Sequence, residues 1–373
     1  MKKKLITLFL ALTLCLSPQA AATAQAVSEP QEITIVMAGD MLLHTPVEQA
    51  SLQADGSYNY DAIFANVASD IADADIAIAN QEVIIGGSQL GVSGYPAFNA
   101  PYEFGDELVD TGFDVICHGT NHCLDKGRQG LVNCLNYWET AHPDIQVLGI
   151  NDSQADYDNI CIYQPAGTDV KIAILNYTYG TNGISEPADM PYAVDYLDEA
   201  KVKADLQAAE QLADFTIVCP HWGTEYSLTT DASQKKWAQI FTAGGADLII
   251  GTHPHVIEPI EWYRDETTGR RALIYYSLGN FVNWTSGTGA GVSNRMVGGL
   301  AQVTLAVDNG QVYIKSHDVE PIVSHVTSGA GGVTVYRLSD YTEELANANE
   351  IRKQAGDFSL SYCQKLVSQV WGK

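Results

Sequence analysis

The sequence is poor in basic residues. Its 373 positions hold 20 lysines and arginines against 45 aspartates and glutamates, so the formal net charge at neutral pH is −25. A chain of this charge repels other polyanions, and the composition argues against nucleic acid and anionic membrane surfaces as partners. Hydrophobic residues make up 46% of the chain, enough for the large buried core of a globular protein.

Long hydrophobic runs are also missing. The longest, Leu5–Leu16, has 12 residues, whereas a membrane-spanning helix needs about 20. Three lysines precede this run, and small residues follow it as far as Ala24 and Ala26, which is the pattern of a secretory signal peptide. We therefore predict a signal peptide over residues 1–26. The protein is expected to be secreted, or to lie on the extracytoplasmic face of a bacterial cell envelope.

Cysteines are few and scattered. Six follow the predicted signal peptide, an even number that is compatible with one or two disulfides in an exported protein. No CxxC pair of the kind that holds zinc is present. Cys219, at the end of the apolar run FTIVC, is interpreted as a buried packing residue. The cysteines are therefore not expected to be metal ligands.

Short apolar segments alternate with amphipathic segments from residue 33 onward. This alternation predicts an α/β fold in which helices cover the faces of a sheet. Strands are expected at residues 33–39, 75–80, 113–119, 145–150, 170–177, 215–223, 247–253 and 272–280. Helices are expected near residues 61–73, 102–111, 127–140, 198–213 and 231–243.

The pattern changes after residue 295. Residues 298–326 alternate with a period of two on both sides of Asn309-Gly310, a dipeptide typical of hairpin turns. A second, antiparallel element is therefore expected, followed by a helical segment up to Trp371. We predict a main domain over residues 27–336 and a C-terminal helical extension over residues 337–373.

Side chains that can bind metals follow five of the predicted strands. In chain order they are Asp40 and His44; Asn80 and Glu82; Asn121, His122 and Asp125; His221 and Glu225; and His253 and His255. Because the carboxyl ends of parallel strands form the functional crevice of an open α/β sheet, these residues could converge on one site. Carboxylate, amide and imidazole donors suit Zn, Mn or Fe.

Each of these residues also has a purely structural interpretation. An aspartate after a strand often caps a helix, asparagine is common in turns, and a single histidine is more often a hydrogen-bonded polar residue than a ligand. If all of these residues were purely structural, the positions of three histidines at strand ends would be independent coincidences. A shared site is therefore favoured. Outside this set, His142, His317 and His325 are expected to be surface or hairpin residues. Candidates for lining the cleft are Trp222, Tyr226 and Asn280.

Six motifs occur in a recognisable order. They are VMAGDMLLH, ADIAIANQE, GFDVICHGTNHCLDKG, PHWGTEY, GTHPHVIEPIE and YSLGNFV. Over about residues 33–283 the chain thus resembles the CapA (poly-gamma-glutamate capsule synthesis) family, a branch of the calcineurin-like metallophosphoesterase superfamily. The resemblance implies a four-layer α-β-β-α sandwich, here with a C-terminal antiparallel hairpin and helix, and a centre at the strand ends with one or two divalent metal ions.

The resemblance also implies roles for single residues. The implied metal ligands are Asp40, Glu82, Asn121, His221, His253 and His255, with Glu82 in the place of the carboxylate that bridges two ions. His122 stands where the superfamily keeps a histidine near the leaving group. Asp125 either orients His122 or caps the following helix.

The sequence departs from the superfamily pattern in its first two motifs. The usual Asp-x-His has Leu42 in place of the histidine, and the nearest histidine is His44. Glu82 replaces the more usual aspartate, and Gln81 stands where leucine is common. A site for one ion and a site for two ions both remain open.

Two functions follow from these inferences. The first is a metal-dependent, phosphoesterase-like hydrolase that acts on an anionic envelope polymer or a phosphoester. The alternative is a non-catalytic component of the capsule machinery that binds or exports poly-gamma-glutamate. A polyanion would need a local positive patch on this acidic chain, for which the candidates are Lys126, Arg128 and Arg295. A purely structural metal site is the weakest interpretation. A structural zinc site is closed by four protein ligands, whereas this chain offers more candidate ligands than one ion needs.

Overall fold

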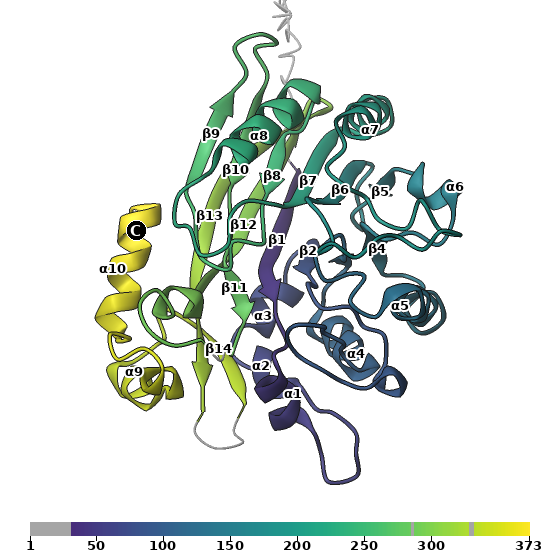
Figure 1. The fold of residues 1–373 in the computed structure, drawn as a ribbon. Helices are drawn as coiled ribbons and strands as arrows, with labels where there is room; N and C mark the ends of the chain where they lie inside the picture. Colours follow the sequence, from purple (N-terminus) through teal and green to yellow (C-terminus); the bar gives the residue numbers. More distant parts are fainter. Residues whose placement is uncertain (1–30, 285–286, 328–331) are drawn as a thin grey trace, which may run out of the picture. The chain divides into compact units, whose positions relative to one another are not determined.

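Two β-sheets lie face to face at the centre of the fold (Figure 1). The computed structural model describes residues 31–284, 287–327 and 332–373. The predicted signal peptide, residues 1–26, lies outside the described residues. Within the described part of the chain, no helix combines the length and the apolar character needed to cross a bilayer.

The first sheet contains eight strands. Seven follow the order β14-β13-β12-β1-β2-β3-β4, and β11 pairs with β1. The strands β1 to β4 are parallel, whereas β12, β13 and β14 each run antiparallel to the preceding neighbour. Their bounds are β1 Gln31–Met41, β2 Ile76–Asn80, β3 Val115–Cys117, β4 Gln146–Leu148, β11 Asn280–Val282, β12 Val297–Asp308, β13 Gln311–Val326 and β14 Val333–Arg337.

The second sheet contains six strands in the order β5-β6-β7-β8-β10-β9. Its four central strands are parallel, and β5 and β9 are antiparallel edge strands. Their bounds are β5 Cys161–Tyr163, β6 Ile172–Thr178, β7 Phe215–His221, β8 Leu248–Ile250, β9 Ile260–Arg264 and β10 Arg271–Tyr275.

The side chains of β1 alternate between the two faces of the first sheet. Ile35 and Met37 join the core between the sheets, where Ile217 of β7 meets them. Val36 and Ala38 belong to the core on the opposite face, under helices. Because both faces are buried, this strand forms an almost continuous apolar run in the sequence.

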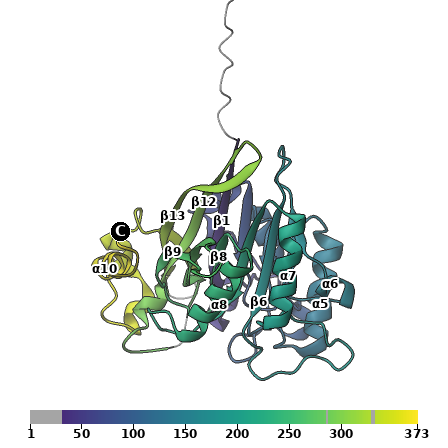
Figure 2. The same ribbon diagram turned by 90° about the horizontal axis from the view of Figure 1, so that it is seen from above.

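Helices cover the outer face of each sheet. The helices α7 and α8 pack on the second sheet (Figure 2), and α4, α5 and the C-terminal helices pack on the first. The predicted four-layer α-β-β-α sandwich is therefore confirmed. The helix bounds are α1 Thr45–Ser51, α2 Asp61–Phe64, α3 Ala68–Ala72, α4 Tyr102–Thr111, α5 Gly127–Ala141, α6 Gln154–Tyr157, α7 Glu199–Leu212, α8 Ala232–Gly244, α9 Glu343–Ala348 and α10 Leu360–Trp371.

Local sequence explains where α8 begins and ends. The Asp231 side chain accepts a hydrogen bond from the backbone N–H of Gln234, whose side chain in turn accepts one from the Asp231 N–H, which is a capping box. At the other end, Gly245 takes a left-handed conformation with φ 116° and closes the helix. The helix predicted from its amphipathic pattern at residues 231–243 is therefore confirmed, and these signals fix its ends.

One prediction of local structure was wrong, and one was confirmed. The helix expected at residues 61–73 is divided into α2 and α3, because Val67 leaves the helical region at φ −129° and ψ −2° and buries its branched side chain. The hairpin turn at Asn309-Gly310 is confirmed, with φ 51° and 78°. The first strand of this hairpin pairs with β1, so the predicted antiparallel hairpin extends the first sheet.

The C-terminal segment packs on the outer face of the first sheet. Tyr341, Ala346 and Cys363 share a core with Ile322 and Val335 of β13 and β14. Residues 31–373 form one compact unit.

Candidate metal centre

The predicted site residues come from both sheets and meet at the carboxyl ends of the parallel strands. Asp40 lies near the end of β1, and Glu82 follows β2 by two residues. His221 is the last residue of β7, and His253 and His255 follow β8. The register places Asp40 beside Asn80 of β2 and Asn280 of β11, so the first carboxylate sits between two neighbouring strand ends.

Glu82 is at the centre of this group. Its side chain is completely buried, and neither carboxylate oxygen has a hydrogen-bond partner among the described residues. The nearest cation candidates are His255 Nε2 at 3.6 Å and His221 Nε2 at 3.8 Å. Burial raises the pKa of Glu82 well above its ordinary value, and His255 offsets this only in part. A buried carboxylate without hydrogen bonds is unfavourable unless a positive charge compensates it.

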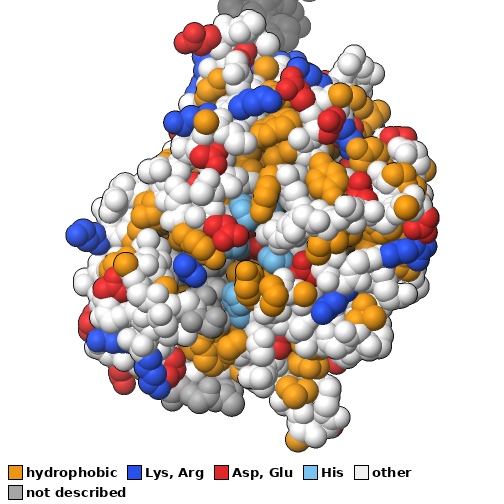
Figure 3. All heavy atoms as spheres, viewed as in Figure 1, with side chains coloured by type: hydrophobic (Ala, Val, Ile, Leu, Met, Phe, Trp, Pro, Cys, Tyr) orange, Lys and Arg blue, Asp and Glu red, His pale blue; other side chains and the backbone are white. Residues whose placement is uncertain are grey.

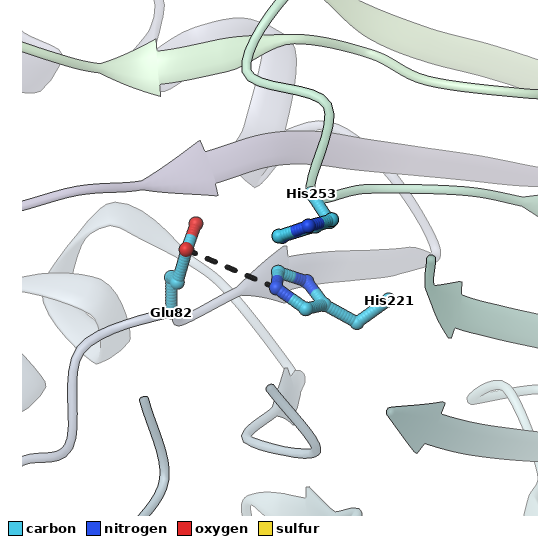
Figure 4. A group of neighbouring side chains, drawn as sticks. All are labelled: Glu82, His221 and His253. Atoms are coloured by element: carbon cyan, nitrogen blue, oxygen red, sulfur yellow. Dashed lines mark ion pairs between the residues drawn. The ribbon is translucent and has the colours of Figure 1, made fainter. Parts of the chain in front are cut away.

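Three overlapping groups of side chains could hold an ion. They are Glu82 with His221 and His253; Asp40 with Glu82 and His255; and Glu225 with His253 and His255. Within each group the ligand atoms all lie within 4.8 Å of one another. Figure 4 shows the first group, with the imidazoles of His221 and His253 next to the Glu82 carboxylate. Because Glu82 belongs to two groups, its position is compatible with the bridging role implied by the family resemblance.

The protonation states of two of the histidines also fit a metal site. Burial lowers the pKa of His221 and of His253 well below the ordinary value, so both imidazoles are neutral and can offer a lone pair. Burial alone would lower the pKa of His255 too, but the carboxylates of Glu82 and Asp40 outweigh it and raise the pKa to about 9. The donor set and the unpartnered Glu82 thus fit a divalent cation.

Asp40 connects the candidate ligands to one another. Its Oδ1 accepts hydrogen bonds from Asn80 Nδ2 at 2.9 Å and from the backbone N–H of His253 at 3.1 Å. Its Oδ2 lies 3.0 Å from His255 Nδ1. The predicted amide ligand is also in place, because Asn121 Oδ1 lies 2.9 Å from His221 Nε2.

The loop after β8 holds its two histidines in an unusual backbone conformation. His253 has φ 98° and His255 has φ 58°, in a region that residues with a side chain rarely adopt. Such conformations cost on the order of 1–3 kcal/mol each and persist only where surrounding contacts impose them. The Pro254 carbonyl, which accepts a 2.7 Å hydrogen bond from the Tyr226 N–H, is one such contact. The loop therefore holds both rings in place at the expense of local strain.

His122 and Asp125 form a pair next to the candidate ligands. His122 Nδ1 lies 2.7 Å from Asp125 Oδ2, which also accepts a hydrogen bond from the Phe98 N–H. The N-cap of α5 is Lys126, and no side chain caps it. Asp125 thus makes the orienting contact with His122, and the alternative of a helix cap is excluded.

A cavity of about 610 Å³ opens beside these residues. Figure 3 shows histidine side chains in the hollow on this face of the molecule. The cavity is lined by Leu42, His44, Tyr95, Pro96, Ala97, Phe98, Asn121, His122, Asp125, Asn182, Ile184, Glu225, Tyr226, His255, Asn280, Asn283, Gly287 and Arg295. A ligand in it would contact His122 and candidate metal ligands at the same time.

His44 and the proposed basic patch occupy different positions. His44 lines the cavity against Phe98, and burial, with repulsion from His255, His122 and Arg295, lowers its pKa to about 4. It lies outside the three ion-binding groups. Of the three basic candidates only Arg295 lines the cavity, whereas Arg128 pairs with Asp189 at 2.8 Å on the surface.

The residues considered for lining the cleft divide between the cavity and the core. Trp222 does not line the cleft: it is buried in the outer core of the second sheet, where its indole N–H donates to the Tyr276 carbonyl. Tyr226 and Asn280 do line the cavity. His142 and His317 lie towards the surface, and His325 lies in the hairpin strand β13, where it is buried against Tyr341, so all three match the prediction of surface or hairpin residues.

The cysteines take no part in the centre. All six described cysteines are free, and none belongs to the three groups that could hold an ion. Cys117 and Cys219 are buried in the core between the sheets, as expected for packing residues.

Sequence reasoning missed two residues of the site. Glu225 was noted at a strand end but left out of the ligand set, although it completes a group with His253 and His255. Asn182 lines the cavity and accepts a hydrogen bond from Asn121 Nδ2 at 3.3 Å. It lies in an irregular loop after β6, so no strand-end signal marked it.

Comparisons with known proteins bear on this site. A family model described as "Bacterial capsule synthesis protein PGA_cap" matches residues 34–285. "PGA biosynthesis protein CapA" of Bacillus subtilis (strain 168) is 34% identical over 191 residues, which cover 48% of this chain and 45% of that protein. "Capsule biosynthesis protein CapA" of Bacillus anthracis is 26% identical over 268 residues, which cover 69% of this chain and 62% of that protein. The chain therefore matches about half of one relative and three-fifths of the other.

A solved structure is also similar. The calcineurin-like phosphoesterase YfkN from Bacillus subtilis has a TM-score of 0.46 and 12% sequence identity, and the match covers 90% of this chain and 99% of that chain.

Proposed function

This chain belongs to the bacterial capsule synthesis protein PGA_cap family, and we propose that within it the chain is an exported, metal-dependent hydrolase. Its substrate would be an anionic polymer of the cell envelope, such as poly-gamma-glutamate, or a phosphoester. Membership of the family agrees with the resemblance carried by the six sequence motifs. Export is proposed from the sequence pattern of residues 1–26.

The buried Glu82 carboxylate is the observation that carries this proposal. Both of its oxygens lack a hydrogen-bond partner among the described residues, and three imidazoles and a second carboxylate surround it. Arg295 is the only lysine or arginine among the described residues that line the adjoining cavity. The centre thus has more carboxylate oxygens and imidazole lone pairs than positive charges to balance them. This is expected of residues arranged to hold a cation.

The residues that would hold one or two ions of Zn, Mn or Fe are Asp40, Glu82, Asn121, His221, His253 and His255, with Glu225 as a further donor. A divalent cation held there would supply Lewis-acid chemistry, polarising the scissile group and stabilising the negative charge that develops on it.

The pair of His122 and Asp125 would handle the proton of the leaving group. The hydrogen bond to Asp125 uses His122 Nδ1, which fixes the ring orientation and leaves Nε2 as the nitrogen that would give a proton to the leaving group. Phe98 packs edge-on against His122, with ring centres 4.7 Å apart, and restricts the ring further. Asp125 therefore acts through His122 and needs no contact with the substrate.

The alternative function is a non-catalytic component that binds or exports the polymer within the capsule machinery. The exposed aromatic residues at the cavity favour it as a second candidate: Tyr95 is 74% exposed and Tyr226 is 45% exposed. Large exposed aromatic side chains beside a cavity are common in binding surfaces. The names of the two relatives, which refer to biosynthesis, are compatible with either candidate.

Metal analysis combined with an activity screen tests the proposal. Purified wild-type protein and a Glu82→Gln variant would be loaded with Zn, Mn or Fe, and the bound metal measured together with hydrolysis of phosphodiester and gamma-glutamyl substrates. We expect stoichiometric metal and turnover in the wild type and a loss of both in the variant. Glu48→Gln is a matched control, because Glu48 is also a buried glutamate but is hydrogen-bonded by Tyr60 outside the site.

Two results would contradict the proposal. Full metal content in Glu82→Gln would show that the carboxylate is not part of the metal site. Metal binding without any turnover, together with metal-dependent binding of poly-gamma-glutamate, would favour the non-catalytic function.

A further inference from the structure

One wall of the cavity carries a stacked arginine. The guanidinium carbon of Arg295 lies 3.6 Å from the centre of the Tyr226 ring, and both residues line the cavity. Among the described lining residues Arg295 is the only lysine or arginine. A guanidinium stacked on an aromatic ring donates its hydrogen bonds in its own plane, at right angles to the contact with the ring.

Arg295 is tied to the candidate metal centre through Asn280. The Asn280 side-chain N–H groups donate to the backbone carbonyl of Arg295 at 3.0 Å and to that of His255 at 3.2 Å. Asn280 is 1% exposed and lies opposite Asp40 in the pairing of β11 with β1. The buried Asn280 amide therefore fixes the 3-10 helix η2 (Ser293–Met296), which carries Arg295, relative to the loop that carries the predicted ligand His255.

The charges around the cavity indicate what Arg295 could bind. The whole chain has a net charge of −25, and the cavity is also lined by the carboxylates of Glu225 and Asp125. Glu225 belongs to a group that could hold an ion, and Asp125 is engaged with His122. An anionic ligand would be repelled from this surface unless a local positive charge stood where the ligand binds. Arg295 supplies that charge on the wall next to His255.

We propose that Arg295 is a specificity residue that binds a carboxylate of the substrate, while Tyr226 supports the face of its guanidinium. The planar fork of an arginine matches the two oxygens of a carboxylate, which a lysine cannot reproduce. The inference rests on the proposed function and deepens it. The substrate is a chain that carries a carboxylate close to the group held at the metal centre, such as a gamma-linked glutamate polymer.

Binding measurements on the metal-loaded full chain test this inference. The probes are a fluorescein-labelled gamma-linked glutamate oligomer, the same oligomer with its carboxylates methylated, and inorganic phosphate as competitor. We expect Arg295→Gln to weaken binding of the acidic oligomer on the order of 10- to 100-fold, and the methylated oligomer to bind equally to both proteins. Arg295→Lys should restore only a small part of the affinity.

Controls separate recognition from folding. Arg270→Gln makes the same chemical change at a surface ion pair with Glu210, outside the cavity, and should bind both oligomers like the wild type. Metal content and thermal unfolding should be unchanged in all three variants, and Arg295→Lys, which keeps the charge over Tyr226, provides a folded variant if Arg295→Gln is unstable.

The outcomes distinguish this inference from the proposed function. Equal affinity of wild type and Arg295→Gln for the acidic oligomer overturns the inference, as does an equal loss for the acidic and methylated oligomers. If phosphate competes in the wild type but not in Arg295→Gln, and the variant binds the oligomer as the wild type does, the anion bound by Arg295 is phosphate. This result overturns the choice of a carboxylate. Because the measurement is of binding, the absence of turnover would sink only the hydrolase proposal.

Discussion

Two polar cavities in the described part of the chain differ in how their buried charges are balanced. The second cavity, about 440 Å³, lies where β4 and β6 approach α7. There, Lys201 forms ion pairs with Asp205 at 2.8 Å and with Asp195 at 3.4 Å, and also donates to the Tyr157 carbonyl. In the candidate metal centre, no lysine or arginine of the described residues pairs with Glu82, and its nearest cationic group is His255, whose Nε2 lies 3.6 Å from Oε1.

This difference distinguishes a site whose buried charges the chain itself balances from a site that could take an external cation. A chain that supplies its own lysine as counterion completes the charge balance during folding, so the second cavity needs no ligand. At the candidate metal centre, His221 and His253 are neutral, and the cationic His255 is shared between the carboxylates of Glu82 and Asp40, which leaves negative charge for an external cation to balance. The backbone at His253 and His255 is also strained. A buried charge that the chain itself balances therefore does not indicate a ligand site. A buried charge that the chain leaves unbalanced does.

The largest effect is expected from His253→Gly. His253 belongs to two of the three groups that could hold an ion, so the variant should lose metal affinity by a factor on the order of 100 or more. Glycine adopts φ 98° without strain, so the metal-free variant should be at least as stable as the metal-free wild type. Equilibrium dialysis and thermal unfolding measure the two effects. A variant that keeps full metal affinity would show that the two cavities do not differ as described.

The next effect, confined to the rate, is expected from His122→Ala. Because His122 is assigned to the leaving group and not to the metal, bound metal should persist while hydrolysis slows by a factor of about 10² to 10⁴, more for poor leaving groups. His142→Ala is the matched control, since His142 also lies 2.7 Å from a carboxylate, that of Asp106, but outside the site. Loss of metal in His122→Ala would make this residue a ligand.

Lys201→Met should affect only the second cavity. Removing the lysine leaves Asp205 and Asp195 without their counterion, and the free energy of unfolding should fall by about 3 kcal/mol, with metal content unchanged. Lys203→Met, on the same helix, breaks an exposed ion pair with Glu199 and should change the free energy of unfolding by less than about 1 kcal/mol. Chemical denaturation measures both variants. Equal stability of the two would mean that Lys201 does not balance the buried aspartates.

An effect of similar size, but one that depends on pH, is expected at Asp195. Burial raises the pKa of this carboxyl to about 6, against an ordinary value of 3.8, so the folded state binds the proton more tightly than the unfolded state. The stabilisation from this group is present below the ordinary pKa and is lost as the pH rises to about 6; a shift of this size corresponds to roughly 3 kcal/mol.

Asp195→Asn removes this contribution, since asparagine does not titrate. The difference between the unfolding free energies of wild type and variant should therefore decrease from pH 4 to pH 6.5, as measured by denaturation in urea. Parallel pH curves for the two proteins would contradict the prediction.

Much of the fold could be predicted because its signals are local. The strands at residues 172–178 and 215–221 were recognisable because burial on both faces requires uninterrupted apolar side chains. The helix at residues 232–244 was marked by its capping box and its terminal glycine. The division of the helix at residues 61–73 was not predictable, since it depends on where Val67 finds space in the core.

The sequence by itself determined which chemical groups stand at the strand ends, because the end of an apolar run and the polar residue after it are neighbours in the chain. Only the tertiary structure decided which of these groups meet. Trp222 turned into the outer core, Glu225 joined His253 and His255, and the stack of Arg295 on Tyr226 came to line the same cavity. Such contacts join segments tens to hundreds of residues apart, and they depend on the pairing of two sheets and the packing between them, which no local periodicity encodes.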